Sequence, residues 1–448
     1  MRTRFLRWGL LLFVFLIPFG TKKFLFDFPT PFRNFYTSEY TSAFLYGSDI
    51  LLFFCLFLLF SSKPLSWWEE RLGKFKAPLF FLALFLIFAA LSLVSAGYFS
   101  FGIYSFGRLA LGVLTALMVG AALKANIVRF KEMAVVFSLA AILQAAVGFL
   151  QFAFQKSVGL WFLGETVFGS GTPGIARVAV NGVNFARAYG TMPHANILAG
   201  FLVLGLLSLF YLFLREEKLI FKSLQTAGIF VILTGLFLTF SRSGWITAAA
   251  ATLLLVVWEF FADKERRRKI IHLLLLLLVI CSLLFVTLGW AISPRARLSS
   301  DEGPVSDRWN YNKIGAELII SHPFGVGIGN QLFYAYHSGL FDKYKVNSLG
   351  QWQPIHNLYL MISSETGIGG LFVFLAFVGW LLIFNFQSIS NQFPISKLQN
   401  ITPVIMLISL LLFGLFDHFF WDLQLGRLML WVVIGILLGL ELRKGAEV

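Results

Sequence analysis

The sequence has few charged residues for its length. Only 13% of its 448 residues are Asp, Glu, Lys or Arg, whereas 58% are hydrophobic and the mean hydropathy is +0.80. Soluble domains contain roughly 25% charged and about 45–50% apolar residues, so an ordinary soluble domain is excluded. A membrane-spanning helix needs about 20 mostly apolar residues, and the chain has a dozen such runs, for example "LLLLLLVICSLLFV". We therefore expect an integral membrane protein.

Cysteine and metal-binding motifs are also scarce. The two cysteines, Cys55 and Cys281, lie inside apolar runs, which argues against a disulfide framework and a thiolate metal site. The acidic residues show no paired spacing typical of metal ligands, and no D-x-D motif occurs. The glycine-rich stretch "HPFGVGIGN" (322–330) lacks the P-loop pattern G-x-x-x-x-G-K-[ST] and is expected to shape a tight loop. The sequence thus predicts neither a metal site nor a cofactor.

The charge that is present is mostly positive. Lys and Arg number 36 against 22 Asp and Glu, a formal net charge of +14. The basic residues cluster in short gaps between apolar runs, as in "REEKLIFK" and "DKERRRK", which is the positive-inside pattern of membrane proteins. Nucleic acid is therefore not an expected partner.

The apolar runs predict an all-α, polytopic fold in a single membrane domain over residues 1–448. About twelve transmembrane helices with both termini in the cytoplasm place the basic gaps on one side. The start "MRTRFLRWGLLLFVFLIPFG" is interpreted as a retained first helix, because no small-residue cleavage site follows it. The runs lie approximately at 8–20, 44–61, 77–97, 104–123, 132–154, 194–214, 221–240, 243–261, 270–292, 357–385, 401–418 and 424–441.

Two segments on the outer side are long, 155–193 and 293–356. The second forms a large extracytoplasmic loop between predicted helices 9 and 10. It has a helical signal of its own in "DRWNYNKIGAELIIS", which Pro323 should end. Because long loops in compact domains usually carry function, this loop is a candidate part of the site.

Three arginines stand on the outer side: Arg187, Arg242 and Arg308. An arginine inside the bilayer costs about 2.5–3.5 kcal/mol on insertion scales, so one kept near the membrane usually faces a cavity or an anion. Its planar fork donates two hydrogen bonds to a phosphate at once. Together they predict a site for an acidic ligand such as pyrophosphate. Snorkelling to headgroups for Arg242, a structural role for Arg187 and a helix anchor for Arg308 are the alternatives.

Polar residues at two helix ends could support this site. His194 and Asn196 open the sixth predicted helix, where the helix N-terminus favours an anion; Asn196 could equally be a cap or an interhelical bond. Near the eleventh, "FDHFFWD" holds Asp417, His418 and Asp422. A structural cluster is the default interpretation of these three, and a role in the acceptor site is the alternative.

His356 closes the large loop and starts the tenth predicted helix, beside Asn357. Histidine is suited to accepting a proton near neutral pH because its ordinary pKa is about 6.5. The alternative is an interfacial histidine without chemistry. On a continuous helix Glu365 would point away from His356, nine positions earlier, at about 100° per residue. Glu365 is therefore expected to serve packing, unless the nearby glycines accompany a broken helix.

The stretch "HNLYLMISSETGIGG" fits the pattern H-[NSQ]-x9-G-x-x-[GTY] of bacterial O-antigen ligases. With "RAYGTMPHANILAG", "LTFSRSGWI", "SHPFGVGIGN" and "GLFDHFFWDLQLGRLMLWVVIG", in that order, the region 140–440 resembles the O-antigen ligase and O-antigen polymerase superfamily. The R-x-x-x-L pattern also associated with the ligases is absent from the large loop. Ligase and polymerase types therefore both remain open, with the ligase type slightly favoured.

The resemblance implies a twelve-helix, GT-C-like membrane glycosyltransferase that is inverting and metal-independent. Its donor would be a glycan linked to undecaprenyl pyrophosphate, and its acceptor a glycolipid such as lipid A core or another glycan, at the periplasmic face of a bacterial inner membrane. His356 would be the general base, and Arg187, Arg242 and Arg308 would bind the pyrophosphate. Asn357, His194, Asn196 and Asp417 are possible supporting residues. A glycolipid flippase is the rival from another functional class, but the unusual charges gather at one face, which favours an enzyme.

Overall fold

Long apolar helices account for most of the structure. The computed structural model describes residues 2–32, 38–62, 76–264, 266–296, 303–346, 352–390 and 394–441. Each of the twelve apolar runs coincides with one long helix. These are α1 (Arg2–Phe15), α2 (Gly47–Ser62), α4 (Lys76–Ser92), α5 (Phe99–Lys124), α6 (Phe130–Phe154), α7 (Ala195–Arg215), α8 (Leu219–Leu238), α9 (Arg242–Ala262), α10 (Arg267–Ala296), α14 (Leu358–Ser390), α15 (Pro394–Gly414) and α17 (Gln424–Glu441).

Eight helices within the described ranges are long and apolar enough to cross a membrane: α4 to α10 and α14. The apolar parts of α2, α15 and α17 are shorter, and α1 has 14 residues. The protein is thus a mostly helical, polytopic membrane protein, while twelve crossings and the orientation of the termini stay predictions.

Helix α7 forms the centre of the bundle. The whole of its apolar span is buried, and it packs against α6, α8, α9 and α15. A helix that is apolar all round belongs inside a larger bundle. Helices α5 and α17 pack against each other extensively. Glycines of both helices let their backbones approach closely there: a Cβ at Gly439 would lie 2.9 Å from the carbonyl oxygen of Gly120.

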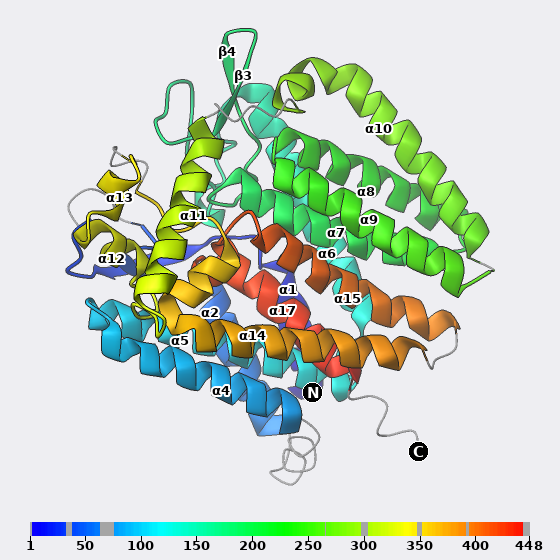
Figure 1. The fold of residues 1–448 in the computed structure, drawn as a ribbon. Coiled ribbons are helices and arrows are strands. Elements are labelled where there is room, and N and C mark those ends of the chain that lie inside the picture. Colours follow the sequence, from blue (N-terminus) through cyan, green and yellow to red (C-terminus); the bar gives the residue numbers. More distant parts are fainter. Residues whose placement is uncertain are drawn as a thin grey trace.

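The predicted large loop contains its own helices, α11 (Gly303–Ser321), α12 (Gln331–His337) and α13 (Leu340–Lys343). The helical signal that Pro323 should end is confirmed by α11. These helices and the β1–β2 pair lie at the left-hand end of the long helices in Figure 1. Residues 297–302 and 347–351 of the loop are outside the described residues.

Two small antiparallel strand pairs were not predicted. They are β1 (Lys22–Asp27) with β2 (Ser42–Tyr46), and β3 (Arg177–Val180) with β4 (Val183–Ala186). Both lie between long helices, and β3–β4 projects from the top of the view in Figure 1. Four- to six-residue strands give too short a pattern to be read from sequence alone.

Helix α14 is broken close to the large loop. Gly367 has φ 80° and ψ 169°, a backbone region open essentially only to glycine. Three backbone hydrogen bonds join the break to the loop 322–330: Val326 N–H to Ser364 O (2.9 Å), Gly327 N–H to Glu365 O (3.1 Å) and Ile368 N–H to Pro323 O (2.9 Å). The glycine-rich stretch therefore provides hydrogen-bond partners for backbone groups at the break in the helix.

Replacing Gly367 by alanine should destabilise the protein by about 1–3 kcal/mol, the usual cost of such backbone strain. A Cβ there would also lie 2.7 Å from the Phe324 carbonyl carbon. The apparent unfolding temperature in detergent measures the effect. Gly379→Ala is the matched control, because it lies in the same helix and its Cβ would meet nothing within 4 Å; equal unfolding temperatures for the two variants would contradict the argument.

Candidate functional site

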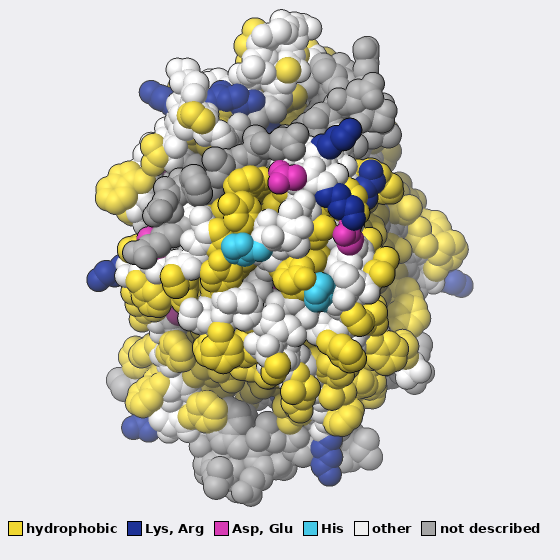
Figure 2. Space-filling model, turned by 60° about the vertical axis from the view of Figure 1, so that its left-hand side comes forward, with side chains coloured by type: hydrophobic (Ala, Val, Ile, Leu, Met, Phe, Trp, Pro, Cys, Tyr) yellow, Lys and Arg dark blue, Asp and Glu magenta, His cyan; other side chains and the backbone are white. Residues whose placement is uncertain are grey.

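A cavity of about 540 Å³ lies where the ends of several helices meet the large loop. Polar side chains on its wall come from distant parts of the chain: Lys22, Glu39, His194, Gln353, His356, Asp417 and His418. Figure 2 shows a face on which histidine and acidic side chains sit among hydrophobic ones, with basic side chains nearby. The cavity therefore combines titratable groups with apolar surroundings, as binding sites commonly do.

His356 is held in one orientation by two contacts. Its Nδ1 lies 2.9 Å from the carbonyl oxygen of Pro354, and its ring stacks on Tyr311 of α11 with centroids 5.1 Å apart and planes 15° apart. A carbonyl oxygen only accepts hydrogen bonds, so Nδ1 carries the proton and Nε2 is the acceptor atom of the neutral ring. His356 is thus oriented as a base at the cavity wall.

A second histidine lies against the first. The ring centroids of His356 and His418 are 4.8 Å apart at 73°. His418 is buried and donates from Nδ1 to the Asp422 carboxylate in α16 (Phe419–Asp422) at 2.7 Å. The two histidines therefore have different environments, and only His418 has a carboxylate directly on its ring.

The surroundings of His356, His418 and Asp417 shift their pKa values in different directions. Burial, and then the neighbouring His418, lower the pKa of His356 to about 3. Burial also opposes charge on His418, but Asp422 and Asp417 outweigh it and raise the pKa of His418. Burial would raise the pKa of Asp417, yet His356, His418 and Arg308 lower it to about 2. His356 is thus neutral and Asp417 ionised at neutral pH.

Arg187 is tied to the cavity through a chain of hydrogen bonds. Its guanidinium donates to the Thr239 carbonyl oxygen (2.5 Å) and to Asn196 Oδ1 (2.7 Å). Asn196 Nδ2 donates to Asp417 Oδ2 (2.8 Å), and the His418 backbone N–H donates to Asp417 Oδ1 (2.9 Å). Asn196 therefore links the segment before α7 to the turn after α15, and Asp417 accepts hydrogen bonds from both Asn196 and the His418 backbone.

The turn that carries Arg187 is fastened to α6 by two buried glutamines. Gln151 Oε1 accepts from the backbone N–H groups of Tyr189 and Gly190, and Gln144 Oε1 accepts from that of Thr191. These glutamines are seven residues apart and share one helix face. Their amides hold the turn in place before α7, whose N-cap His194 accepts from the Asn196 N–H (3.1 Å).

The other two predicted arginines lie on different elements. Arg308 is one helical turn before Tyr311 on α11, so both share a face, and its charge acts on His194, His356, Asp417 and His418. Arg242 is the first residue of α9, two residues after a turn that begins at Thr239, the acceptor of Arg187. None of the three arginines lines the cavity of about 540 Å³; Arg187 is joined to its wall through Asn196 and Asp417.

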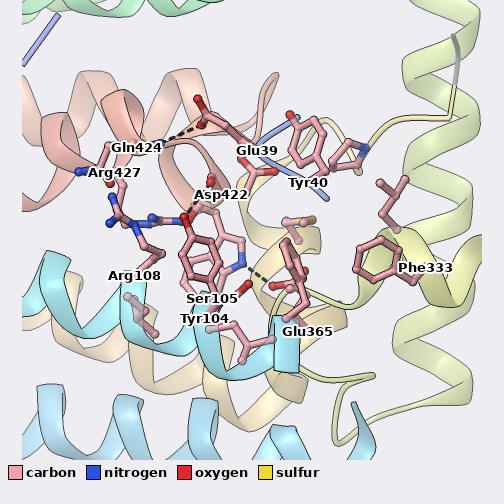
Figure 3. A pocket seen from close by; sticks show the side chains of 18 of the residues that line it. Glu39, Tyr40, Tyr104, Ser105, Arg108, Phe333, Glu365, Asp422, Gln424 and Arg427 are labelled. Atoms are coloured by element: carbon pink, nitrogen blue, oxygen red, sulfur yellow. Dashed lines mark hydrogen bonds between the residues drawn. The ribbon is translucent and has the colours of Figure 1, made fainter. Parts of the chain in front are cut away.

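Asn357 and Glu365 make hydrogen bonds that stabilise the fold near the site. Asn357 caps α14, because its Oδ1 accepts from the N–H groups of Tyr359 and Leu360, and its amide donates to the Leu415 carbonyl oxygen (3.1 Å). Glu365, buried beside the break in α14, accepts from Trp421 Nε1 (2.7 Å). Figure 3 shows Glu365 at a smaller interior cavity of about 50 Å³, opposite Arg108 and Arg427.

Tyr311 was not among the predicted site residues, and His418 and Asp422 were expected to form mainly a structural cluster. The signal for Tyr311 was its i, i+3 spacing from Arg308 on a helix that had been predicted. Within the described ranges, no group of three or more His, Cys, Asp or Glu side chains is arranged to hold a metal ion.

Comparison with known protein families gives a match over part of the chain. Residues 227–375 match the family model described as O-antigen ligase, a stretch that contains Arg242, Arg308 and His356 and runs from α8 into α14. No curated protein matches the chain. The matched stretch is thus similar to the O-antigen ligase and polymerase superfamily, a glycosyltransferase-like family, and supports a relationship of the chain to it.

Proposed function

We propose that this protein is an O-antigen ligase-type glycosyltransferase. It transfers an oligo- or polysaccharide from undecaprenyl pyrophosphate to an acceptor hydroxyl, such as one of lipid A core, at the outer face of the bacterial inner membrane. The observation that carries the proposal is His356, a neutral histidine with Nε2 as its acceptor atom, on the wall of a large cavity and within the field of Arg308.

The proposed reaction is a single inverting displacement. Nε2 of His356 takes the proton of the acceptor hydroxyl as its oxygen bonds to the anomeric carbon of the donor sugar. The bond from that carbon to the pyrophosphate oxygen breaks, and the leaving group keeps the electron pair. Arg187, Arg242 and Arg308 stabilise the negative charge on this group, commonly the largest contribution to such catalysis. The residues present need no cofactor for these steps.

The position of the polar groups supports an enzyme over a transporter. His194 caps the start of α7, Arg242 opens α9, Asn357 precedes α14 and Asp417 follows the end of α15. All four therefore stand at one end of the bundle, which suits a site open to one side of the membrane. With both termini in the cytoplasm, that side is the periplasm.

Reconstitution into liposomes tests the proposal. The donor is undecaprenyl pyrophosphate carrying an oligosaccharide, and the acceptor is either lipid A core or a second molecule of the donor. Glycan transfer to lipid A core is expected. Transfer only to the second donor molecule would show that the protein is a polymerase. Movement of the donor across the bilayer without any transfer would show that it is a flippase and not an enzyme.

The pH dependence of transfer should reflect the depressed pKa of His356. Since burial and His418 lower it from 6.5 to about 3, the neutral base persists as the pH falls below 6.5 and is lost only far below it. The initial rate should therefore stay nearly constant from pH 7 to pH 5. In His418→Gln the loss of the neighbouring charge should move the acid limb to higher pH, and an unchanged limb would contradict this assignment.

A further inference from the structure

A second cavity of about 500 Å³ adjoins the candidate active site. The two cavities share Lys22, Glu39 and Pro193 on their walls. The two cavities are therefore direct neighbours, with these three residues at their common boundary. Nothing in the proposed chemistry at His356 uses this second space.

Two aromatic side chains form part of its wall. Trp161 and Phe162 lie on the single turn η3 (Trp161–Leu163), with exposed fractions of 69% and 55%. Their ring centroids are 5.9 Å apart and the ring planes are nearly perpendicular, at 88°. The cavity thus presents broad apolar ring surface to whatever fills it.

A buried carboxylate fixes this aromatic turn rigidly. Glu165 accepts hydrogen bonds from the backbone N–H groups of Val158 (2.6 Å), Gly159 (2.9 Å) and Leu160 (2.5 Å) and from the amide of Gln151 (2.8 Å). It is 5% exposed, so these four donors compensate the cost of burying its charge. The turn is therefore preorganised before any ligand arrives.

The turn is also locked against the segment before β1. Gly164, with φ +92°, packs so tightly that a Cβ would lie 2.5 Å from the carbonyl carbon of Gly20. Thr21 Oγ1 donates to the Phe162 carbonyl oxygen at 3.2 Å. Backbone packed this closely fixes the position of the turn relative to the segment that leads into β1.

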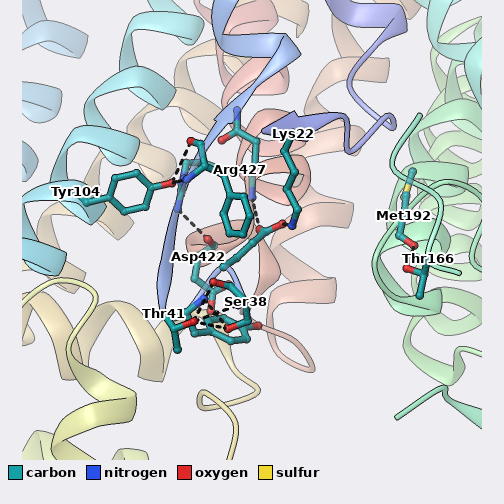
Figure 4. A network of polar contacts seen from close by, with 12 residues as sticks. Lys22, Ser38, Thr41, Tyr104, Thr166, Met192, Asp422 and Arg427 are labelled. Atoms are coloured by element: carbon teal, nitrogen blue, oxygen red, sulfur yellow. Dashed lines mark hydrogen bonds and ion pairs between the residues drawn. The ribbon is translucent and has the colours of Figure 1, made fainter. Parts of the chain in front are cut away.

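Polar side chains also line the second cavity. The Lys22 ammonium pairs with Glu39 at 2.8 Å, and Thr166 Oγ1 donates to the Met192 carbonyl oxygen at 3.4 Å; Figure 4 shows Thr166 and Met192 facing each other, to the right of Lys22. The cavity therefore offers aromatic faces next to hydroxyl, ammonium and carboxylate groups.

This combination suits a sugar ring. Aromatic faces carry negative charge density, and the C–H face of a pyranose has slightly positive hydrogens, so the two stack, while ring hydroxyls bond to polar neighbours. We propose that the second cavity is a subsite for sugar residues one or more units away from the reacting centre, with Trp161 and Phe162 as its stacking platform. The inference rests on the proposed glycan transfer and names a binding site within it.

Kinetics of the double variant Trp161→Ala/Phe162→Ala test the subsite. The donor is undecaprenyl pyrophosphate carrying one sugar or five, and the acceptor is lipid A core. We expect KM to rise at least tenfold for one substrate while kcat changes less than twofold. A rise for the five-sugar donor alone assigns the subsite to the donor glycan, and a rise for lipid A core assigns it to the acceptor. Trp161→Phe should retain most of the affinity.

Trp290→Ala is the control, since Trp290 is an exposed aromatic (49%) on α10 and should leave both KM values unchanged. If the double variant keeps both wild-type KM values, the subsite is overturned although transfer stands. If it instead lowers kcat and leaves both KM values unchanged, the rings do not bind sugar and the subsite is likewise overturned.

A binding measurement separates this inference from the proposed function. Saturation-transfer NMR with the free oligosaccharide, released from the donor by mild acid, requires no transfer. A signal in the wild type that is lost in the double variant supports the subsite even if the wild type transfers nothing. An equal signal in both proteins overturns it.

Discussion

Replacing His356 by alanine should reduce glycan transfer by about 100- to 10,000-fold, the usual contribution of a general base. The variant keeps the cavity but loses Nε2, the atom assigned to receive the acceptor proton. Donor binding should change little, because the arginines are untouched. Initial rates with saturating donor and acceptor in liposomes measure the effect.

His337→Ala is the matched control for this variant. His337 lies in α12 of the same loop region, where it bonds to the hydroxyl of Tyr98 (2.7 Å), and it does not line the cavity of about 540 Å³. Its loss should leave the rate within twofold of the wild type. If His356→Ala transferred normally while Arg242→Ala did not, the family would stand and the base would have to be another group.

The second large effect is expected at Arg308. Arg308→Gln should lower kcat by about 100- to 1,000-fold, comparable to removing one group that stabilises charge in a transition state. Arg308 acts electrostatically on His194, His356, Asp417 and His418, so its charge reaches the histidines and Asp417 on the cavity wall. If it stabilises the leaving pyrophosphate, the loss must appear chiefly in kcat.

Lys313→Gln removes a positive charge from an exposed position on the same helix. It controls for a general electrostatic effect of α11 and should leave kcat unchanged. Arg308→Lys should recover part of the activity, because the charge returns without the planar fork. Equal losses in Arg308→Gln and Lys313→Gln would show that only the net charge of the helix matters.

The helices could be predicted because their cause is local. Each apolar run in a membrane must satisfy its own backbone hydrogen bonds, so a run long enough to cross becomes a helix wherever it lies in the fold. This holds for α7. Helix α11 is not an apolar run, and it was predicted instead from the helical signal of the loop, which Pro323 ends. The number of membrane crossings does not follow from the local sequence in the same way, because the apolar parts of α2, α15 and α17 are shorter than those of the other helices.

Individual site residues could be recognised, but their roles depended on partners far away in the chain. Asn196 and Asp417 are 221 residues apart, and the sequence left Asn196 as a cap or an interhelical bond. His418 and Asp422 were visible as a cluster, yet only the approach of His356 to His418 makes them part of the site. Contacts of this kind arise from packing and leave no periodic pattern.

In the helix that contains Glu365, some features followed from the local sequence and others from tertiary contacts. The sequence by itself determined that this segment is apolar and helical and that a histidine stands at its start. Whether the helix continues was decided by the loop 322–330, whose backbone supplies hydrogen bonds to the break at Gly367. The sequence thus determined the membrane helices and the residue types of the site, because both follow from short-range chemistry. Only the tertiary structure decided which of those side chains meet, because the packing of the helices brings together residues that are far apart in the sequence.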